Sequence, residues 1–247
     1  MERVYKTKHA TLYLGDCLDV MPRLRRKADI VVTSPPYNTL GTRMPTNGTG
    51  LLKSSRWLRK VNKIGYSDDV DETTYQAWLN YVLSMAADIT QGLVWVNHKV
   101  RYRDGVAVHP ARFLRFPIYS EVVWARAGSI ALNCRRFAPS HEGLWAFGRP
   151  HFWDNDCNAL LSVWSITQVA NRTDHPCPFP LELAARPIRA SCPPGGVVVD
   201  PFAGSCTVGV AALAHGRRFI GIEKNPAYID DAIARLKGWR NETAKAA

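Results

Sequence analysis

The feature that most constrains the fold is a strand, tight turn, helix and second strand near the C-terminal end. Residues 196–200 form an apolar run with three consecutive valines, and residues 219–223 form a second apolar run. Between them lie a turn of small and polar residues, 201–207, and a helical segment, 208–215, that Gly216 closes. Short apolar strands joined through a helix are typical of parallel strands that are buried on both faces. The sequence therefore predicts an α/β fold, with a mainly parallel sheet and helices on both of its faces.

The same unit carries acidic residues at its strand ends. Glu223 follows the tight turn by about twenty residues, and a carboxylate in that place can accept both hydroxyls of a ribose. Asp200 ends the first strand, and an alternative role for it is to cap the turn. Asn225 and Pro226 then open a further amphipathic helix. The turn has neither the Gly-x-Gly-x-x-Gly pattern of dinucleotide sites nor a Walker loop, and it admits a ligand with a charged amino-acid end.

A second buried strand, 29–33, runs directly into a rigid polar turn. Pro35 and Pro36 fix φ and remove two donors, so the carbonyls of this turn are free to accept hydrogen bonds. Ser34 adds a hydroxyl and Tyr37 adds a flat aromatic face. Acceptors beside an aromatic ring suit the exocyclic amine of a stacked, extruded base, whose lone pair is delocalised into its own ring. The alternative is an ordinary strand end followed by a Pro-Pro turn.

Asp16 ends another short strand, 11–14, ahead of a helix that we expect over residues 19–26. In open α/β sheets such a position lies at the edge that binds ligands. Asp16 is equally suited to cap the following helix.

Together these segments resemble one enzyme family. Ser34–Tyr37 resembles the (Ser/Asp/Asn)-Pro-Pro-(Tyr/Phe) catalytic motif of amino-directed DNA methyltransferases, and Asp200–Thr207 resembles their Asp-Pro-Phe-x-Gly-Ser-Gly-Thr cofactor motif. The order, with the catalytic motif first, resembles the β group, a circular permutation of the Rossmann-like class I methyltransferase fold. The resemblance implies one domain over residues 1–247, a seven-stranded sheet, S-adenosylmethionine as cofactor, and methyl transfer to the exocyclic amine of a flipped base in DNA. A Ser in the catalytic motif most often accompanies cytosine-N4 enzymes, which favours cytosine N4 over adenine N6.

The resemblance also implies roles for individual residues. Ser34, Pro35, Pro36 and Tyr37 would be catalytic. Asp16 would contact the adenine end of the cofactor, Glu223 its ribose, and His175, Pro176 and Phe179 its methionine end. The full set implied for cofactor binding is Asp16, Thr33, His175, Pro176, Phe179, Asp200, Pro201, Phe202, Ala203, Gly204, Ser205, Thr207, Glu223, Lys224 and Asn225.

Cys206 departs from the family pattern, which normally has Gly at this position. If the backbone there needs a positive φ, the Cβ costs on the order of 1 kcal/mol. This residue keeps open an alternative of another class, a catalytically inactive DNA-binding protein with a methyltransferase fold.

A formal net charge of +11 favours a polyanionic partner. Residues 39–66 contain six basic and no acidic residues, with aromatic residues interleaved, which indicates a DNA-contacting insertion rather than a solvated basic loop. A second basic cluster follows at Arg101 and Arg103. The sequence has no basic amphipathic helix for an anionic membrane, and RNA stays open as a substrate. The residues expected to bind DNA, double-stranded and with base flipping, are Arg43, Lys53, Arg56, Arg59, Lys60, Lys63, Arg101 and Arg103.

The rest of the chain predicts further elements. We expect a helix from residue 73, a strand over 93–97, a β-hairpin from strands 118–124 and 143–147, and a helix from Pro180 that Pro187 kinks or shortens. Residues 149–174 have no clear period, and in the family a target-recognition segment usually lies here.

The six cysteines are scattered, without a Cys-x-x-Cys pair, so we expect reduced thiols and no metal site. No apolar run approaches a membrane span of about 20 residues, and the first residues are no secretory signal. We expect a cytoplasmic protein, bacterial or phage-encoded, of the restriction-modification type. A homodimer is compatible with the sequence.

Overall fold

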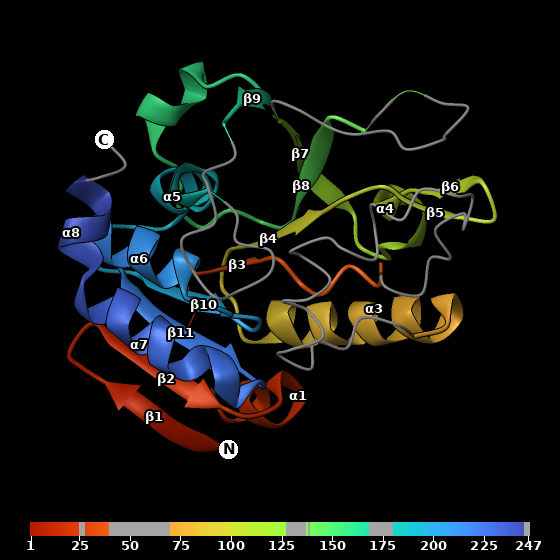
Figure 1. Cartoon of the computed structure of the whole chain (residues 1–247). Helices are drawn as coiled ribbons and strands as arrows, with labels where there is room; N and C mark the ends of the chain where they lie inside the picture. The colour runs from red at the N-terminus through yellow and green to blue at the C-terminus, as the bar shows by residue number, and fades with distance from the viewer. Residues whose placement is uncertain (25–27, 40–69, 127–136, 138, 168–179, 245–247) are drawn as a thin grey trace, which may run out of the picture.

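The computed structural model describes residues 1–24, 28–39, 70–126, 137, 139–167 and 180–244. Its strands form one nine-stranded sheet in the order β1-β2-β11-β10-β3-β4-β8-β7-β9, with a separate β5-β6 hairpin (Figure 1). The strands are β1 Glu2–Lys6, β2 Ala10–Leu14, β3 Ile30–Thr33, β4 Leu93–His98, β5 Arg101–Arg103, β6 Val106–Val108, β7 Ile118–Ala125, β8 His141–Gly148, β9 Val163–Ser165, β10 Val197–Asp200 and β11 Arg218–Glu223. The helices are α1 Cys17–Val20, α3 Glu72–Asp88, α4 Pro110–Phe113, α5 Leu181–Ser191, α6 Thr207–Ala214, α7 Ile229–Lys237 and α8 Trp239–Ala244, with short 3-10 turns η1 Met21–Arg23, η2 Asn155–Ala159 and η3 Pro226–Tyr228.

The centre of the sheet is parallel, from β2 through β11, β10 and β3 to β4. Next to it, β8 and β7 form the expected antiparallel hairpin. Among the described residues the sheet has nine strands, so the expectation of seven is wrong. The two additional strands lie at its edges: β1 pairs antiparallel with β2, and β9 pairs parallel with β7.

Alternation along the strands divides the core into two layers. Ile30 and Val32 of β3 point into the layer that α5, α6 and α7 cover, whereas Val31 points into the layer of α1 and α3. Figure 1 shows α5, α6 and α7 on one side of the sheet and α1 and α3 on the other. The prediction of helices on both faces is confirmed.

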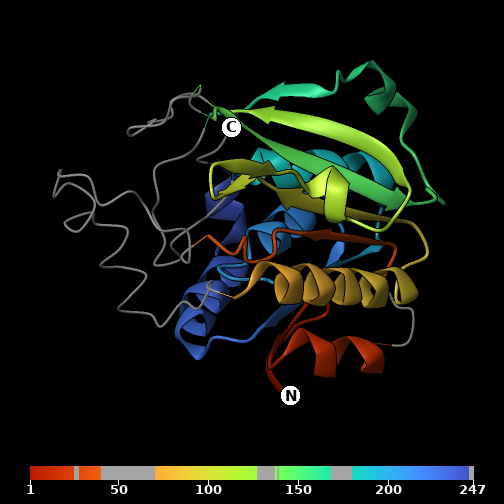
Figure 2. The same cartoon turned by 90° about the vertical axis from the view of Figure 1, so that its right-hand side faces the viewer.

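The chain reverses its direction of travel between β10 and β3. From β10 the chain passes through α6 to β11 on one side, and from β3 it passes through α3 to β4 on the other. Such a switch point opens a crevice at the carboxyl ends of the two strands, where open α/β sheets bind ligands. In Figure 2, α3 runs below the β7–β8 hairpin and above α1.

Two expected helices differ from the structure. The helix expected over residues 19–26 is instead the short α1 and η1, because Pro22 occupies the first turn of η1 and has no N–H to donate back into α1. The helix α5 continues through Pro187 to Ser191, so Pro187 does not shorten it. Ala184 and Ile188 around Pro187 are buried against the sheet, and this burial offsets the lost hydrogen bond.

The candidate target-recognition segment 149–174 is divided by the sheet. Gly148 ends β8 opposite Leu93, the first residue of β4, and β9 runs in the same direction as β4. Residues 149–162 therefore lie at the edge opposite to the crevice, and the chain returns to the crevice edge only after Ser165. This corrects the expectation for residues 149–162, while residues 168–174 lie outside the described residues. Within the described ranges, no helix is both long and apolar enough to cross a membrane.

Candidate active site

The first component of the site is the carboxylate that ends β10. Asp200 is 2% exposed, and its Oδ1 accepts hydrogen bonds from the Thr33 hydroxyl at 2.7 Å and from the Phe202 N–H at 3.0 Å. Burial raises the pKa of Asp200 to about 7, against the lowering effect of these two hydrogen bonds. Asp200 therefore caps its own turn, as the structural alternative expected, and also joins the end of β10 to the end of β3.

The turn that follows has two residues in the left-handed region. Gly204 has φ +50 and Cys206 has φ +60, and the Cys206 side chain is fully buried. Ser205 and Thr207 are buried too, and their hydroxyls accept from Arg235 at 2.8 and 3.0 Å. Each hydroxyl keeps its own proton for a further acceptor, because Arg235 can only donate.

Glu223, at the end of β11, lies beside this turn. Its two carboxylate oxygens accept the N–H groups of Gly204 and Asn225, both at 2.7 Å. Burial raises the pKa of Glu223, which is 9% exposed. A carboxylate offers about four lone-pair sites, so each oxygen can still accept one more donor. The side chain of Asn225 caps η3 and does not face a ligand.

Asp16 does what its structural alternative expected, since it caps α1 by accepting from the Leu18 N–H at 3.0 Å. Its other oxygen accepts from Lys224 Nζ at 2.8 Å. Partial burial works to raise the pKa of Asp16, but the hydrogen bonds from Lys224 and Leu18 outweigh it and hold the pKa below its usual range. The ends of β2 and β11 are therefore joined by an ion pair, and this site edge carries three carboxylates in all.

The catalytic turn follows β3 on the other side of the crevice. The hydroxyls of Ser34 and Tyr37 lie 2.9 Å apart. Tyr37 also donates toward Asn97 Oδ1 at 2.5 Å and Glu142 Oε2 at 3.2 Å. Asn97 in turn donates to the Gly143 carbonyl at 3.1 Å. The end of β4 and the beginning of β8 thus support the turn from below.

A buried tyrosine and histidine hold the second proline of the turn. Tyr75 donates to the Pro36 carbonyl at 2.6 Å, and its hydroxyl lies 2.8 Å from His98 Nε2. Complete burial lowers the pKa of His98 to about 3, so its ring is neutral. Among the described residues no donor reaches the Pro35 carbonyl, which leaves it to accept from a substrate. The His98 ring lies 4.8 Å from the Tyr37 ring, centroid to centroid.

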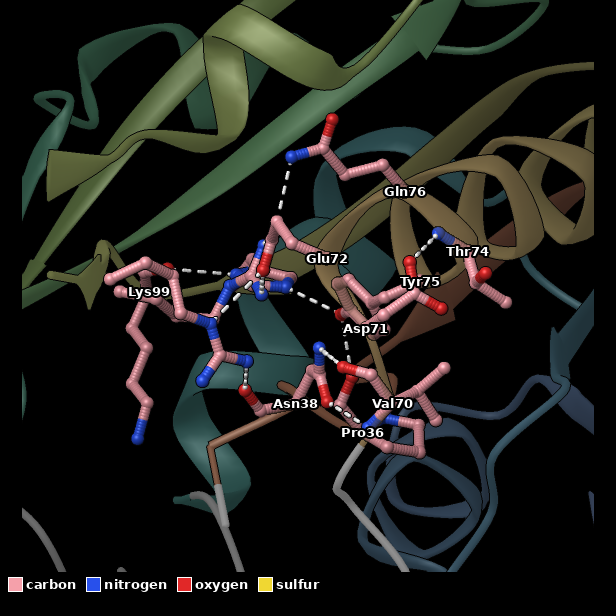
Figure 3. Close-up of polar contacts among 12 residues, drawn as sticks. Pro36, Asn38, Val70, Asp71, Glu72, Thr74, Tyr75, Gln76 and Lys99 are labelled. Atoms are coloured by element: carbon pink, nitrogen blue, oxygen red, sulfur yellow. Dashed lines mark hydrogen bonds and ion pairs between the residues drawn. The ribbon is translucent and has the colours of Figure 1, made fainter. Parts of the chain in front are cut away.

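The residue after the turn clamps the chain. Asn38 has φ +55 and is 1% exposed. Its side chain accepts from the Val70 N–H and donates to the Val70 carbonyl, both at 2.8 Å, and the two residues face each other in Figure 3. Residues 39–69 therefore leave and rejoin the described fold at one point.

The expectation that Arg101 contacts DNA is wrong. Its guanidinium is fully buried, forms two hydrogen bonds of 2.6 and 2.7 Å to Glu72, and lies 4.5 Å from the centroid of the Tyr75 ring. Arg103 also pairs with Glu72 and donates to the Asn38 carbonyl at 2.6 Å, with 21% of its side chain exposed. Figure 3 shows Glu72 and Tyr75 at the centre of this network. Both arginines hold the stem of the turn, because a buried carboxylate needs a paired charge.

Several predicted site residues lie outside the described residues. These are Arg43, Lys53, Arg56, Arg59, Lys60, Lys63, His175, Pro176 and Phe179. Pro201, Phe202 and Ala203 lie in the turn after β10, where Trp78 of α3 contacts the Phe202 ring at 5.6 Å between centroids. Within the described ranges no group of His, Cys, Asp or Glu is arranged to hold a metal ion.

Sequence reasoning missed Tyr75, Asn97, His98 and Glu142. Asn97 and His98 end the buried strand β4, so the rule that drew attention to Asp16 also applied to them. Tyr75 fitted the apolar face of a helix, and Glu142 depended on the antiparallel register of β8. Neither carried a signal in the sequence.

The fold and the site define a class I methyltransferase dependent on S-adenosylmethionine. The model of the N6/N4 DNA methylase family matches residues 28–234, and the chain belongs to that family. It is 29% identical over 277 residues to the Type II methyltransferase M.ScaI of Streptomyces caespitosus, covering 94% of this chain and 83% of the relative. It is 26% identical over 294 residues to M.XycI of Xanthomonas campestris pv. cyanopsidis, covering 96% and 91%.

Solved structures share the fold. The cytosine-N4-specific PvuII DNA methyltransferase has a TM-score of 0.72 at 17% identity, covering 100% of this chain and 96% of that one. A DNA modification methylase of Thermus thermophilus, solved in complex with S-adenosyl-L-methionine, has a TM-score of 0.63 at 22% identity, covering 94% and 95%. The chain is therefore a DNA methyltransferase, and DNA is its substrate.

The residues at the crevice fit the cofactor. S-adenosylmethionine carries a positive sulfonium, an ammonium group and ribose hydroxyls, all of which suit acceptors or negative charge. Asp16, Asp200 and Glu223 provide three carboxylates along one edge. Gly204, which has no side chain, lies between them in the left-handed region and leaves the turn open to close approach.

Proposed function

We propose that this enzyme methylates the N4 amine of cytosine in double-stranded DNA, after the base leaves the helix. The observation that supports this most is the hydrogen bond between Thr33 and Asp200, because it holds the catalytic turn and the cofactor turn at one crevice. Ser34 in the first motif position favours cytosine over adenine.

The bound cofactor supplies an electrophilic methyl group. The chain itself orients the amine that receives it: the Ser34 hydroxyl and the Pro35 carbonyl accept the two N–H groups, and the Tyr37 ring stacks on the extruded base. Tyr75 holds the Pro36 carbonyl at 2.6 Å, so the direction of the neighbouring Pro35 carbonyl is fixed before the base arrives. Positioning supplies most of the acceleration, and no covalent enzyme intermediate is needed.

Methyl transfer from labelled cofactor to DNA, followed by digestion to nucleosides, tests the target base. We expect N4-methylcytosine. Recovery of N6-methyladenine alone would overturn the base assignment. Replacement of Ser34 by Ala should lower turnover by about 100-fold without weakening cofactor binding, since the hydroxyl contacts the amine and not the cofactor.

An inactive DNA-binding protein remains the second candidate, and Cys206 is the observation that favours it. Its positive φ makes the cofactor turn less favourable than with glycine. Calorimetry with S-adenosylmethionine separates the two functions, because an inactive protein should show no binding at about millimolar cofactor.

For the DNA contacts we propose the basic residues of segment 39–66 and the residues that follow β9, both of which begin at the crevice edge. Replacing Lys53, Arg56 or Arg59 by Gln should each reduce the salt dependence of DNA affinity by about one phosphate contact. Action on DNA in the bacterial cytoplasm, beside a restriction enzyme, accords with this proposal, and a homodimer stays a prediction for gel filtration.

A further inference from the structure

The hydroxyl of Tyr37 connects the catalytic turn to a buried carboxylate. On one side it lies 2.9 Å from Ser34 Oγ, and on the other it lies 3.2 Å from Glu142 Oε2. Glu142 is 7% exposed, and its second oxygen, Oε1, is paired with Arg126 Nη1 at 3.0 Å. The oxygen that faces Tyr37 is therefore not the one that binds the arginine.

The register of the hairpin creates this arrangement. Strand β8 runs antiparallel to β4, so the beginning of β8 lies at the edge where β4 ends, with Gly143 opposite His98. Arg126 follows the end of β7, whose Trp124 pairs with Glu142. Two neighbouring strands thus bring an ionised pair to within hydrogen-bond reach of the turn.

Methylation of an exocyclic amine creates a need for a proton acceptor. As the new N–C bond forms and the S–C bond of the cofactor breaks, the nitrogen becomes positively charged and must lose one proton. Ser34 can receive this proton only by passing its own onward, because a hydroxyl holds one proton stably. The amide oxygen of Asn97 accepts a hydrogen bond but is too weak a base to keep a proton. Of the three partners of the Tyr37 hydroxyl described above, only the Glu142 carboxylate can hold it.

We propose that Glu142 is the terminal acceptor of the proton that the substrate amine loses, reached through Ser34 and Tyr37. The amine proton moves to Ser34 Oγ, the Ser34 proton to the Tyr37 oxygen, and the Tyr37 proton to Glu142 Oε2. Each hydroxyl ends with one proton as it began, the carboxylate becomes a neutral acid, and the base ends neutral with its methyl group. Arg126 keeps Glu142 ionised before the reaction. The inference rests on the proposed function, and it assigns Tyr37 a second role besides stacking.

Single-turnover methyl transfer with variants of the relay tests the proposal. Glu142→Gln keeps an oxygen for the Tyr37 hydroxyl but cannot take a proton, and Tyr37→Phe keeps the ring but removes the hydroxyl. Each should slow the chemical step by about 100-fold. The double variant should be no slower than the slower single variant, since both break one path. Glu121→Gln is the matched control: Glu121 lies on the neighbouring strand, accepts from the Trp145 indole at 3.0 Å, and should leave the rate unchanged.

Two further readouts separate proton transfer from a structural role. Cofactor affinity by calorimetry, and base extrusion followed with a fluorescent cytosine analogue, should stay within about twofold of the parent in both single variants, because neither depends on the relay. The acid limb of the pH–rate profile should disappear in Glu142→Gln. The titratable and charged groups that face the relay among the described residues are Arg126 on Glu142, and His98 and Lys99 on the Tyr37 ring.

The outcomes are distinct. A parent protein that transfers no methyl group to DNA would refute the proposed function itself. An active parent with a Glu142→Gln rate within about threefold of it, or with additive losses in the double variant, would overturn the relay alone. If Glu142→Gln does not fold, Tyr37→Phe at unchanged base extrusion decides the question, since a rate equal to that of the parent would also overturn it.

Discussion

The Thr33 hydroxyl donates a 2.7 Å hydrogen bond to the Asp200 carboxylate, across 167 positions of the chain. Thr33 is the last residue of β3 and precedes the catalytic turn directly, while Asp200 is the last residue of β10 and precedes the cofactor turn. Because both residues are buried, this contact fixes the two turns relative to each other at the switch point of the sheet.

Thr33→Val should weaken cofactor binding about tenfold. The change keeps the shape of the side chain but leaves a buried carboxylate without one donor, which costs about 1 to 3 kcal/mol. Calorimetry with S-adenosylmethionine measures the affinity. The control is Thr11→Val on β2, which lies on the same sheet and should leave affinity unchanged. Equal affinities of the parent and Thr33→Val would refute a role for this contact in the cofactor site.

Asp200 should make the free protein less stable as pH rises from about 4 to about 7. Its pKa is raised from 3.8 to about 7 in the folded state, so the folded protein holds this proton where the unfolded chain has already lost it. The stabilisation is present below the unfolded pKa and is lost as pH rises through the folded pKa, at most about 4 kcal/mol.

Urea unfolding at about pH 4.5 and about pH 7.5 measures this dependence. His98, whose folded pKa is lowered to about 3, works in the opposite direction, so the comparison is between the parent and Asp200→Asn. Asp200→Asn should gain stability relative to the parent as pH rises. A constant difference between the two proteins over this interval would contradict the raised pKa.

Glu72→Gln should lower the free energy of unfolding by about 3 kcal/mol. It leaves the Arg101 guanidinium, whose side chain is 0% exposed, without its carboxylate. The control is Glu182→Gln, which breaks exposed ion pairs with Arg186 and Arg189 and should cost less than about 1 kcal/mol. Arg101→Met should leave the salt dependence of DNA affinity unchanged, and a smaller salt slope would restore Arg101 as a phosphate contact.

The parallel core and the edge at which the motifs meet could be predicted from the sequence, because apolar strands followed by polar turns obey a simple rule. The edge strands could not. In β1, Glu2 and Lys6 are exposed, and no apolar run marks the strand. The short β9 is defined by its pairing with β7 rather than by its composition.

The partners of the catalytic turn were hidden for a related reason. Glu142 reaches Tyr37 because of the register of β8 on β4, and register is a property of pairing that one strand alone does not reveal. Arg101 was expected on the surface because of its charge, whereas its carboxylate partner lies 29 positions earlier on α3. Net charge predicts the kind of partner a protein binds, but it does not tell which arginine faces that partner.

Cys206 supplies the last prediction, because two effects of similar size act on it in opposite directions. At φ +60 a side chain costs about 1 to 2 kcal/mol, while burial of the Cys206 side chain stabilises the fold by about 1 kcal/mol. Cys206→Gly should therefore keep the free energy of unfolding within about 1 kcal/mol of the parent. Cys206→Ala keeps the strain and loses the sulfur, so it should be less stable than Cys206→Gly.

Urea unfolding ranks these variants, and Cys192→Gly is the matched control. Cys192 is equally buried but has φ −110, so its replacement relieves no strain and should cost more than about 2 kcal/mol. Cofactor affinity should not fall in Cys206→Gly, since glycine adopts the left-handed conformation freely. If Cys206→Gly were as damaging as Cys192→Gly, the turn would not be strained, and the departure from the family pattern would have no energetic consequence for cofactor binding.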